Sequence, residues 1–174
     1  MTPEDEPLSE SSSHHPNSLR AFDVLGRFLE EDGWYPRRVG GKYSYSMTYN
    51  GRHGDLRCYA IIRVDVEEFL FYAIAPVKIP EEVRPAVAEY LTRANYGLRI
   101  GNFELDYADG EVRYKSSLGF AGQELTVDLI SNAIYPAVHT MDRYLPGLLR
   151  VSYGGATPFE AIEEVEGGMQ DKEA

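Results

Sequence analysis

Acidic and basic side chains crowd one short stretch of the sequence, residues 103–115, which reads FELDYADGEVRYK. Carboxylates this close together could act as a general acid and a general base, provided that burial raised the pKa of one of them. Charged residues usually face solvent, however, and nothing in their spacing requires burial. The stretch is therefore interpreted first as scaffold.

The same stretch predicts a β-hairpin, because Asp109-Gly110 is typical of a two-residue turn between antiparallel strands. Such a turn makes one face of the hairpin apolar and places opposite charges across from each other on the second face. Cross-strand charge pairs contribute about 0.2–1 kcal/mol each, which explains the charges without any catalysis. The expected pairs are Tyr107 with Val112, Asp106 with Arg113, Leu105 with Tyr114, and Glu104 with Lys115.

Other reactive residues do not predict a catalytic or metal site. Cys58 occupies the apolar row of a predicted strand, which is the ordinary position of a small buried residue. His139 and Asp142 share a predicted helix three residues apart, but stable metal sites usually take three or four protein ligands. The sequence contains no nucleotide-binding glycine loop, nucleophile elbow or zinc-protease motif. We expect a protein that is not an enzyme and that has no cofactor and no metal.

Composition limits the partners and the location of the protein. A chain of 174 residues is expected to form one domain. Its net charge of -11 lies mostly at the ends, since residues 18–153 contain 18 acids and 16 bases. We expect no nucleic-acid partner, because that middle stretch contains no basic run. One cysteine, an N-terminus without a secretory leader and the lack of any long apolar stretch predict a cytoplasmic protein outside the membrane.

Three segments of different composition divide the chain. Residues 1–17 combine proline, serine and acids with little to bury, which predicts a disordered acidic tail. Residues 18–153 contain the apolar periodicities of an α+β domain. Residues 154–174 contain the capping-box sequence TPFE before an acidic end, so we expect a short capped helix and a second acidic tail there.

The periodicities within the domain predict the element order α-βββ-α-ββ-α. Strands are expected over 43–49, 56–64 and 69–74, with Tyr49 opposite Leu56 so that the apolar rows coincide. The hairpin adds two strands and completes a five-stranded antiparallel sheet. Of the three helices, the first begins at Ser18, the second follows Pro80, and the long third helix runs from Thr126 until Pro146-Gly147 breaks it.

Two stretches of the chain resemble a known family. They read VRPAVAEYLTRANYGLRIGNFELDYADGEVRYKSSL at 83–118 and TMDRYLPGLLRVSYGG at 140–155. Together they resemble the YbjN-like family, described as bacterial sensory transduction regulators, over about residues 18–165. The resemblance implies a fold similar to the type III secretion chaperones: a curved antiparallel sheet, helices on one side of it, and frequent homodimers. It implies no activity, cofactor or catalytic residues.

Helices on one side would leave the second face of the sheet bare. On that face the pattern places Tyr59 and Ile61 beside one row of the third strand, which is apolar on both sides. That row is either Phe69, Phe71 and Ala73 or Leu70, Tyr72 and Ile74. Aromatic residues are enriched where proteins bind partners. We therefore predict an interface for a second copy or another protein, with the candidate residues Arg57, Tyr59, Ile61, Arg63 and Tyr72.

Three alternatives remain open at this point. The long helix or the C-terminal segment could cover the patch within one chain. The protein could also be a structural subunit of a larger assembly. A different class of function is a small-molecule sensor or an enzyme, with a pocket between the long helix and the sheet. The candidate pocket residues are Tyr114, Tyr135 and His139.

Overall fold

The structure, a computed structural model, describes residues 15–167. The predicted acidic tails therefore lie outside the described residues, apart from the last residues before 18 and those from 154 to 167. The elements are α1 (Pro16–Glu31), β1 (Arg37–Arg38), β2 (Ser44–Asn50), β3 (Asp55–Arg63), β4 (Glu68–Lys78), a 3-10 turn (Glu81–Val83), α2 (Arg84–Gly97), β5 (Asn102–Leu105), β6 (Glu111–Gly119), α3 (Val127–Tyr153) and α4 (Pro158–Gly167).

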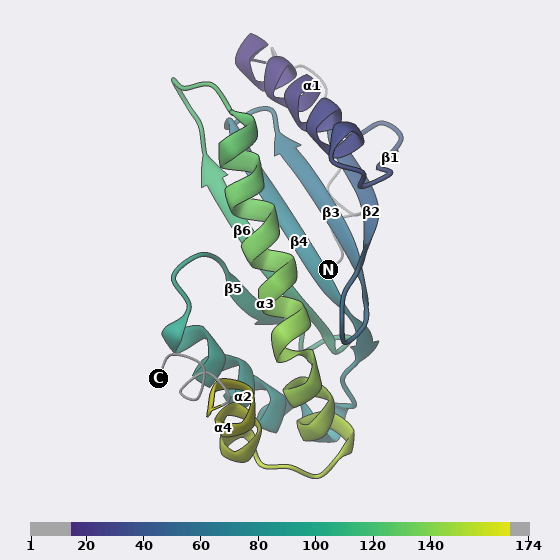
Figure 1. Cartoon of the computed structure of the whole chain (residues 1–174), viewed down its shortest axis with the longest axis vertical. Coiled ribbons are helices and arrows are strands. Elements are labelled where there is room, and N and C mark those ends of the chain that lie inside the picture. The colour runs from purple at the N-terminus through teal and green to yellow at the C-terminus, as the bar shows by residue number, and fades with distance from the viewer. Residues whose placement is uncertain (1–14, 168–174) are drawn as a thin grey trace.

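The sheet is antiparallel and has six strands, not five, in the order β1-β2-β3-β4-β6-β5. The added strand, β1, consists of Arg37 and Arg38, both exposed. Two polar residues show no apolar alternation, so the pattern could not reveal this strand. The α+β class and the antiparallel sheet are confirmed, with α1 and α3 lying across one face (Figure 1).

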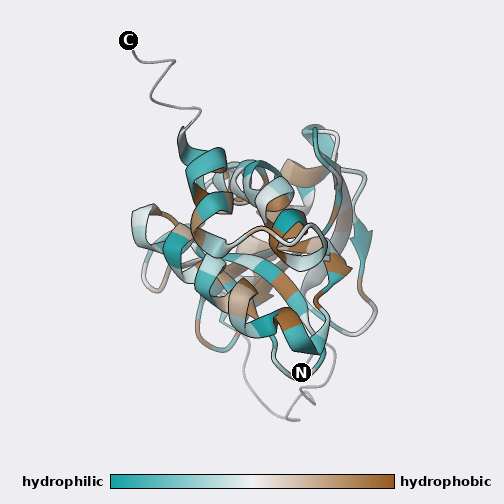
Figure 2. Ribbon diagram, turned by 90° about the horizontal axis from the view of Figure 1, so that it is seen from below, coloured by the Kyte–Doolittle hydropathy of each residue, from teal (hydrophilic) through white to brown (hydrophobic). Residues whose placement is uncertain are grey.

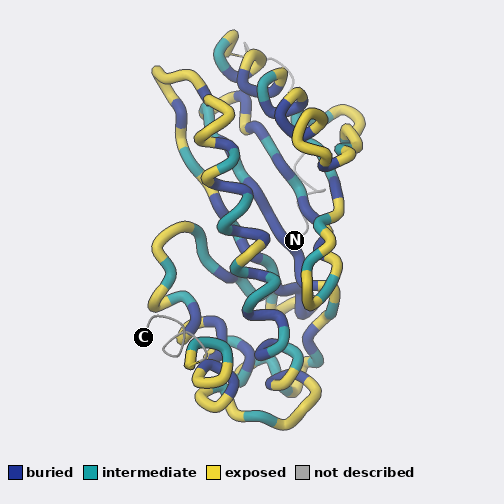
Figure 3. Tube along the Cα trace, viewed as in Figure 1, coloured by how far each residue is buried: buried dark blue, intermediate teal, exposed yellow. Residues whose placement is uncertain are grey.

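The register of β2 and β3 is the one that the apolar rows predict. Tyr49 lies opposite Leu56, and Met47 lies opposite Cys58. The next strand, β4, is central in the sheet, and Phe71 on it is fully buried beneath the helices. Burial is continuous over residues 71–75 of β4, whereas it alternates along β3 (Figure 3).

The β5–β6 hairpin is present, but its predicted register is wrong by two residues. Leu105 lies opposite Val112, and Glu104 lies opposite Arg113. A shift of two residues preserves the alternation of side chains, so each face of the hairpin keeps the residues predicted for it.

The register differs because five residues, 106–110, connect the strands in place of the predicted two-residue turn. Asp106 Oδ1 accepts a hydrogen bond from Ala108 N (2.7 Å), and Asp109 Oδ1 accepts one from Glu111 N (2.8 Å). Gly110 closes the loop in the left-handed region with φ +78°, and its N–H donates to Asp106 O (2.8 Å). Both aspartates therefore stabilise loop backbone, which is common for this residue type.

The long helix α3 does not break at Pro146-Gly147, as the sequence predicted, but continues to Tyr153. Beyond Pro146, Leu148 and Val151 are buried in the core. Burial of these residues offsets the hydrogen bond that proline removes. The fully buried Tyr90 of α2 packs against Gly147, and its Oη donates to Tyr144 O (2.8 Å).

Two predicted helix ends are confirmed. Gly33 follows α1 in the left-handed conformation with φ +77°, although α1 begins at Pro16, slightly before the expected Ser18. At the other end of the chain, Thr157 N donates to Glu160 Oε2 (2.9 Å) and Glu160 N donates to Thr157 Oγ1 (3.3 Å). This reciprocal pair is the capping box that opens α4.

The C-terminal helix α4 is amphipathic. Ala161 and Ile162 are buried, whereas Glu163 and Glu164 are exposed. Figure 2 views the molecule from this end, and hydrophilic and apolar residues mix along the helix ribbons there. The helix packs against α2 and α3 and closes that end of the core.

One edge of the sheet is covered by a side chain. Phe103 on the edge strand β5 donates its N–H to Asn95 Oδ1 (2.7 Å), and its carbonyl accepts from Asn95 Nδ2 (3.1 Å). The amide of Asn95, on α2, thus makes the two hydrogen bonds that a further strand would make, and edge strands need such protection.

Candidate protein interface on the open face of the sheet

A row of apolar and aromatic side chains crosses the sheet on the face that the described helices leave uncovered. Tyr59 pairs with Tyr72 across β3 and β4, and Ile61 pairs with Leu70. Tyr59, Ile61 and Leu70 are half-buried, whereas Tyr72 and Ile74 are buried, at 9% and 5% exposure. We call this surface the open face, and it comprises Arg57, Tyr59, Ile61, Arg63, Leu70, Tyr72 and Ile74.

The pairing also decides which row of β4 lies on the open face. Ala60 faces the helices and is paired with Phe71, so Phe71 belongs to the covered face. The alternating side chains of a strand then put Leu70, Tyr72 and Ile74 on the opposite side. Of the two rows that the sequence left open, the second is the one on the bare face.

Arginine side chains cover part of the open face. The Arg113 guanidinium of β6 lies 4.4 Å from the centre of the Tyr72 ring, and that of Arg57 lies 6.0 Å from the Tyr59 ring. Arg57 and Arg63 are exposed, as expected of a rim. Arg113 adjoins the open face through its pairing with Ile74, but sequence reasoning missed it because it paired Arg113 with Asp106 across the hairpin. The pairing of β6 with β4 places it there, and no pattern in the sequence indicates that pairing.

Glu104 lies at the edge of this surface and binds two of its cations. Its carboxylate accepts hydrogen bonds from Arg113 Nε (2.7 Å) and from Lys115 Nζ. Burial alone would raise the pKa of Glu104, but the hydrogen bonds and positive charges of Lys115 and Arg113 outweigh it and lower the pKa. The pairing is therefore stabilising when Glu104 is ionised.

This pairing predicts an acid-dependent loss of stability. A carboxyl whose pKa is lower in the folded than in the unfolded state adds to the free energy of unfolding. The full contribution is present above the pKa of the unfolded state, and it is lost as the pH falls through the pKa of the folded state. We expect Glu104→Gln to lower the free energy of unfolding by about 0.5–1 kcal/mol at neutral pH, and by progressively less below about pH 4. Urea unfolding at a series of pH values measures the difference.

The control for this experiment is Glu89→Gln, which removes an exposed i,i+4 ion pair with Arg93 on α2. At neutral pH, Glu89→Gln should lower the free energy of unfolding by about 0.3–0.5 kcal/mol, which is no more than the effect expected of Glu104→Gln. A deficit of Glu104→Gln that stays constant down to strongly acidic pH would show that the charge pairs do not stabilise the hairpin.

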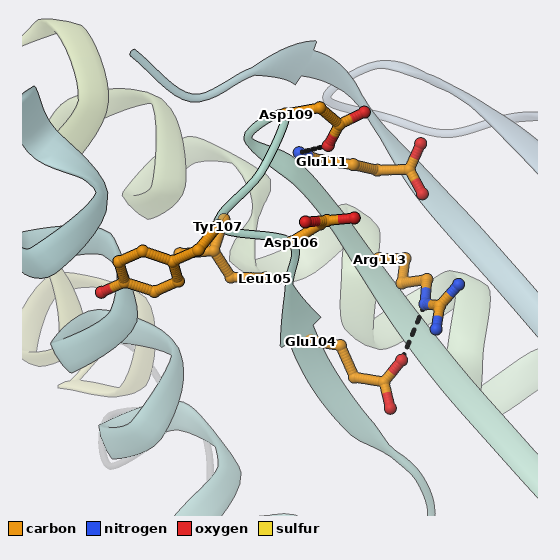
Figure 4. A pocket seen from close by; sticks show the side chains of 7 residues that line it. All are labelled: Glu104, Leu105, Asp106, Tyr107, Asp109, Glu111 and Arg113. Carbon is orange, nitrogen blue, oxygen red and sulfur yellow. Dashed lines mark hydrogen bonds and ion pairs between the residues drawn. The ribbon is translucent and has the colours of Figure 1, made fainter. Parts of the chain in front are cut away.

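The charged hairpin also lines a pocket of about 550 Å³. Figure 4 shows its lining, in which the carboxylates come from both strands of the hairpin and from its loop, and Tyr107 points away from Arg113. The lining residues are Glu104, Leu105, Asp106, Tyr107, Asp109, Glu111 and Arg113. A hydrogen bond from Lys78 lowers the pKa of Asp109, and Glu111 Oε2 lies 3.4 Å from the same Lys78 Nζ. A general acid needs the opposite shift, so these carboxylates favour the scaffold interpretation.

The structure brings together two of the three candidate pocket residues. Tyr135 and His139 lie side by side on α3, with ring centroids 5.8 Å apart. Tyr114 is fully buried in the core instead, where its Oη donates to Ile100 O and its ring packs edge-on against Phe103.

The remaining reactive residues are engaged in structure. Cys58 is fully buried, and burial raises its pKa to about 12, which opposes formation of a thiolate. Asp142 accepts a hydrogen bond from His53 N (2.8 Å) and thereby joins α3 to the β2–β3 turn. Within residues 15–167, no three His, Cys, Asp or Glu side chains are placed to hold a metal ion. No helix in the same range has the length and apolar character to cross a membrane.

Comparisons with known proteins agree with this architecture. The family model YbjN, described as "Putative bacterial sensory transduction regulator", matches residues 21–150. The crystal structure of YbjN from E. coli, titled "a putative transcription regulator", is similar with a TM-score of 0.54 and 13% identity, over 70% of this chain and 85% of that one. The ExsC-ExsE complex is similar with a TM-score of 0.51 and 12% identity, over 74% and 93% respectively. At these identities the likeness shows a shared fold. No curated protein sequence matches the chain significantly.

Proposed function

Because this chain belongs to the YbjN family, we propose that it is a non-enzymatic protein-binding module, regulatory or chaperone-like, that binds its partner through the open face. The observation that carries the proposal is the row of Tyr59, Ile61 and Leu70, which lies half exposed across adjacent strands. Contiguous apolar surface of this kind is uncommon on a monomer unless it binds something. Its aromatic centre and arginine rim are typical of interfaces.

Charge indicates what the partner should look like. Counted over the strand residues on the side of the open face, bases outnumber acids by six to four: Arg37, Arg57, Arg63, Lys78, Arg113 and Lys115 against Asp55, Glu68, Glu104 and Glu111. The whole chain has a net charge of -11, so this is a basic surface on an acidic protein. Complementary charges steer and select partners. We therefore propose that the occupant is a segment of another protein that combines acidic and apolar residues.

A second copy of the chain is the alternative occupant, and it is the homodimer that the sequence predicted. Two copies meeting through this surface would bring like charges together, which weakens association. The fold neighbour that is a complex of ExsC with ExsE is consistent with binding of a different protein. Sedimentation of the purified chain distinguishes the two occupants, since only a homodimer doubles the mass without an added partner.

Substitution at the centre of the open face tests the proposal. Ile61→Glu places an acid in the apolar row and should weaken binding of an acidic partner by roughly 30-fold or more, the effect of losing a strong contact residue. Ile61→Arg, which removes the apolar contact but keeps the charge favourable, should weaken it less. Partners captured by the parent from the native host are purified and their affinities for each variant are measured by calorimetry.

The control is Val66→Glu, because Val66 is an exposed apolar residue on the β3–β4 turn, outside the open face. It should leave the affinity unchanged. Equal affinities of the parent and both Ile61 variants, with the partner's acidic segment unprotected from hydrogen exchange, would show that the open face is not the binding surface.

A further inference from the structure

Four aromatic rings that are distant in sequence meet on the helix side of the sheet, beside α3. Trp34 follows α1, Tyr49 lies on β2, and Tyr135 and His139 lie one turn apart on α3. Successive ring centroids around the group are 5.8 Å (Trp34–Tyr49), 6.2 Å (Tyr49–His139), 5.8 Å (His139–Tyr135) and 6.0 Å (Tyr135–Trp34). Each ring thus contacts two others, and we call this closed group the aromatic circuit.

Local structure fixes each ring in place. Gly33, with φ +77°, reverses the chain after α1, and Trp34 N donates to Leu29 O (2.9 Å). The spacing of Tyr135 and His139 puts them on one face of α3. Tyr49 is held by its strand pairing with Leu56. The circuit therefore does not depend on a flexible loop.

Two carboxylates flank the aromatic circuit. Asp32 Oδ2 accepts hydrogen bonds from Trp34 Nε1 (3.0 Å) and from Tyr135 Oη. Asp142 lies on α3 beyond His139, where its Oδ1 accepts a hydrogen bond from His53 N (2.8 Å) and its Oδ2 lies 3.3 Å from His53 Nδ1. Negative charge next to aromatic faces attracts cations.

Among the described residues, no arginine lies over the rings of the circuit. The arginines that lie over aromatic rings elsewhere in the described chain use Phe22, Tyr59, Tyr72, Tyr144 and Phe159. Solvent reaches one side of the circuit, because His139 is exposed and Tyr49 and Tyr135 are half-buried, whereas Trp34 is buried at 8% exposure. An acidic group of rings that is accessible, and over which no arginine lies, differs from ordinary core packing.

We propose that the aromatic circuit binds a small organic cation bearing a methylated or quaternary ammonium group. Such a group is weakly hydrated and apolar at its surface, and aromatic rings bind it by cation–π attraction. Sodium and potassium ions hold their water too strongly to compete well there. This function is separate from the open face, which lies on the other side of the sheet, and it uses two of the residues that the sequence assigned to a small-molecule pocket.

The tryptophan of the circuit provides a direct readout, because Trp34 is the chain's only tryptophan. Tetramethylammonium chloride, added to the full chain, should change Trp34 fluorescence along a saturating curve with half-saturation at roughly 1–10 mM. Sodium chloride at equal ionic strength and tert-butanol at equal concentration should not. A response to tert-butanol that equals the tetramethylammonium response would overturn the proposal, since it would show simple apolar binding.

Substitutions separate ring contacts from hydrogen bonding. Tyr135→Leu and His139→Leu should each raise the half-saturation concentration at least fivefold, and His139 is exposed, so its variant is expected to fold. Tyr135→Phe keeps the ring and should bind like the parent. The control Tyr96→Leu replaces an exposed tyrosine on α2, 97% accessible, and should change nothing. Unchanged affinity in folded His139→Leu would contradict the proposal.

Two further ligands identify the source of the cation. Choline represents a free metabolite, and Nε-trimethyllysine represents a modified protein side chain. The ligand with the lower half-saturation concentration indicates to which of these two classes the natural ligand belongs. If neither gives a saturating response, the proposal fails. Ile61→Glu should leave the titration unchanged, so a failure of the open-face proposal is distinguishable from a failure of this one.

Discussion

Gly147→Ala should lower the free energy of unfolding by about 1–3 kcal/mol, although alanine is ordinarily the better helix former. A Cβ at this position would overlap Tyr90 Oη and lie 2.8 Å from Tyr90 Cζ. Tyr90 cannot move away easily, because it is fully buried and its Oη is bound to Tyr144 O. The substitution therefore forces α2 and α3 apart, and urea unfolding followed by circular dichroism measures the cost.

A second glycine gives a matched control. Gly97 ends α2, and a Cβ added there would have no other atom within 4 Å. Gly97→Ala should raise the stability by a few tenths of a kcal/mol and at most about 1 kcal/mol. Opposite signs for the same chemical change would establish the close approach of α2 and α3. A stabilising effect at both positions would show that Tyr90 yields to the new methyl group.

Two neighbouring residues of β4 should respond differently to alanine. Phe71 faces the helices, is fully buried and packs edge-on against Trp34, so Phe71→Ala should cost about 3–5 kcal/mol. Tyr72 lies on the open face, where water can fill the space left by its ring. Tyr72→Ala should therefore cost less, about 1–2 kcal/mol, while weakening partner binding severely.

Tyr72→Phe tests the cause of the binding defect. It preserves the ring beneath Arg113, whose guanidinium lies 4.4 Å from the ring centre, and should behave like the parent in stability and in affinity. Thermal unfolding and calorimetric titration are measured on all three variants. A Tyr72→Ala variant as unstable as Phe71→Ala would mean that both faces of β4 are equally part of the core.

The sequence predicted structure best where the signal repeats along a strand or helix. Tyr49 opposite Leu56 could be aligned because one buried face requires both apolar rows to coincide. The hairpin register was wrong because Asp109-Gly110 suits several loops, and hydrogen bonds of the aspartates to backbone N–H groups decide between them. At Pro146, local propensity was outweighed by burial of the residues that follow it.

The candidate sites, too, could be predicted only where their residues repeat along one strand or helix. Tyr59 and Ile61 could be placed on one face because strand residues alternate. Trp34 and Tyr49 could not be joined to His139 in advance, because the meeting depends on how α3 crosses the sheet. No period along the chain connects residues from a loop, a strand and a helix, so a site of this kind is visible only in three dimensions.

Asn95 also determines how far strands of this protein could stack between molecules. Its amide makes both hydrogen bonds that Phe103 offers at the β5 edge, so among the described strands the accessible edge lies at the opposite end, at β1 and β2. Fibres grow only when each molecule has two edges open for joining. Asn95 blocks strand addition at Phe103 and therefore disfavours continuous strand-to-strand stacking of this fold.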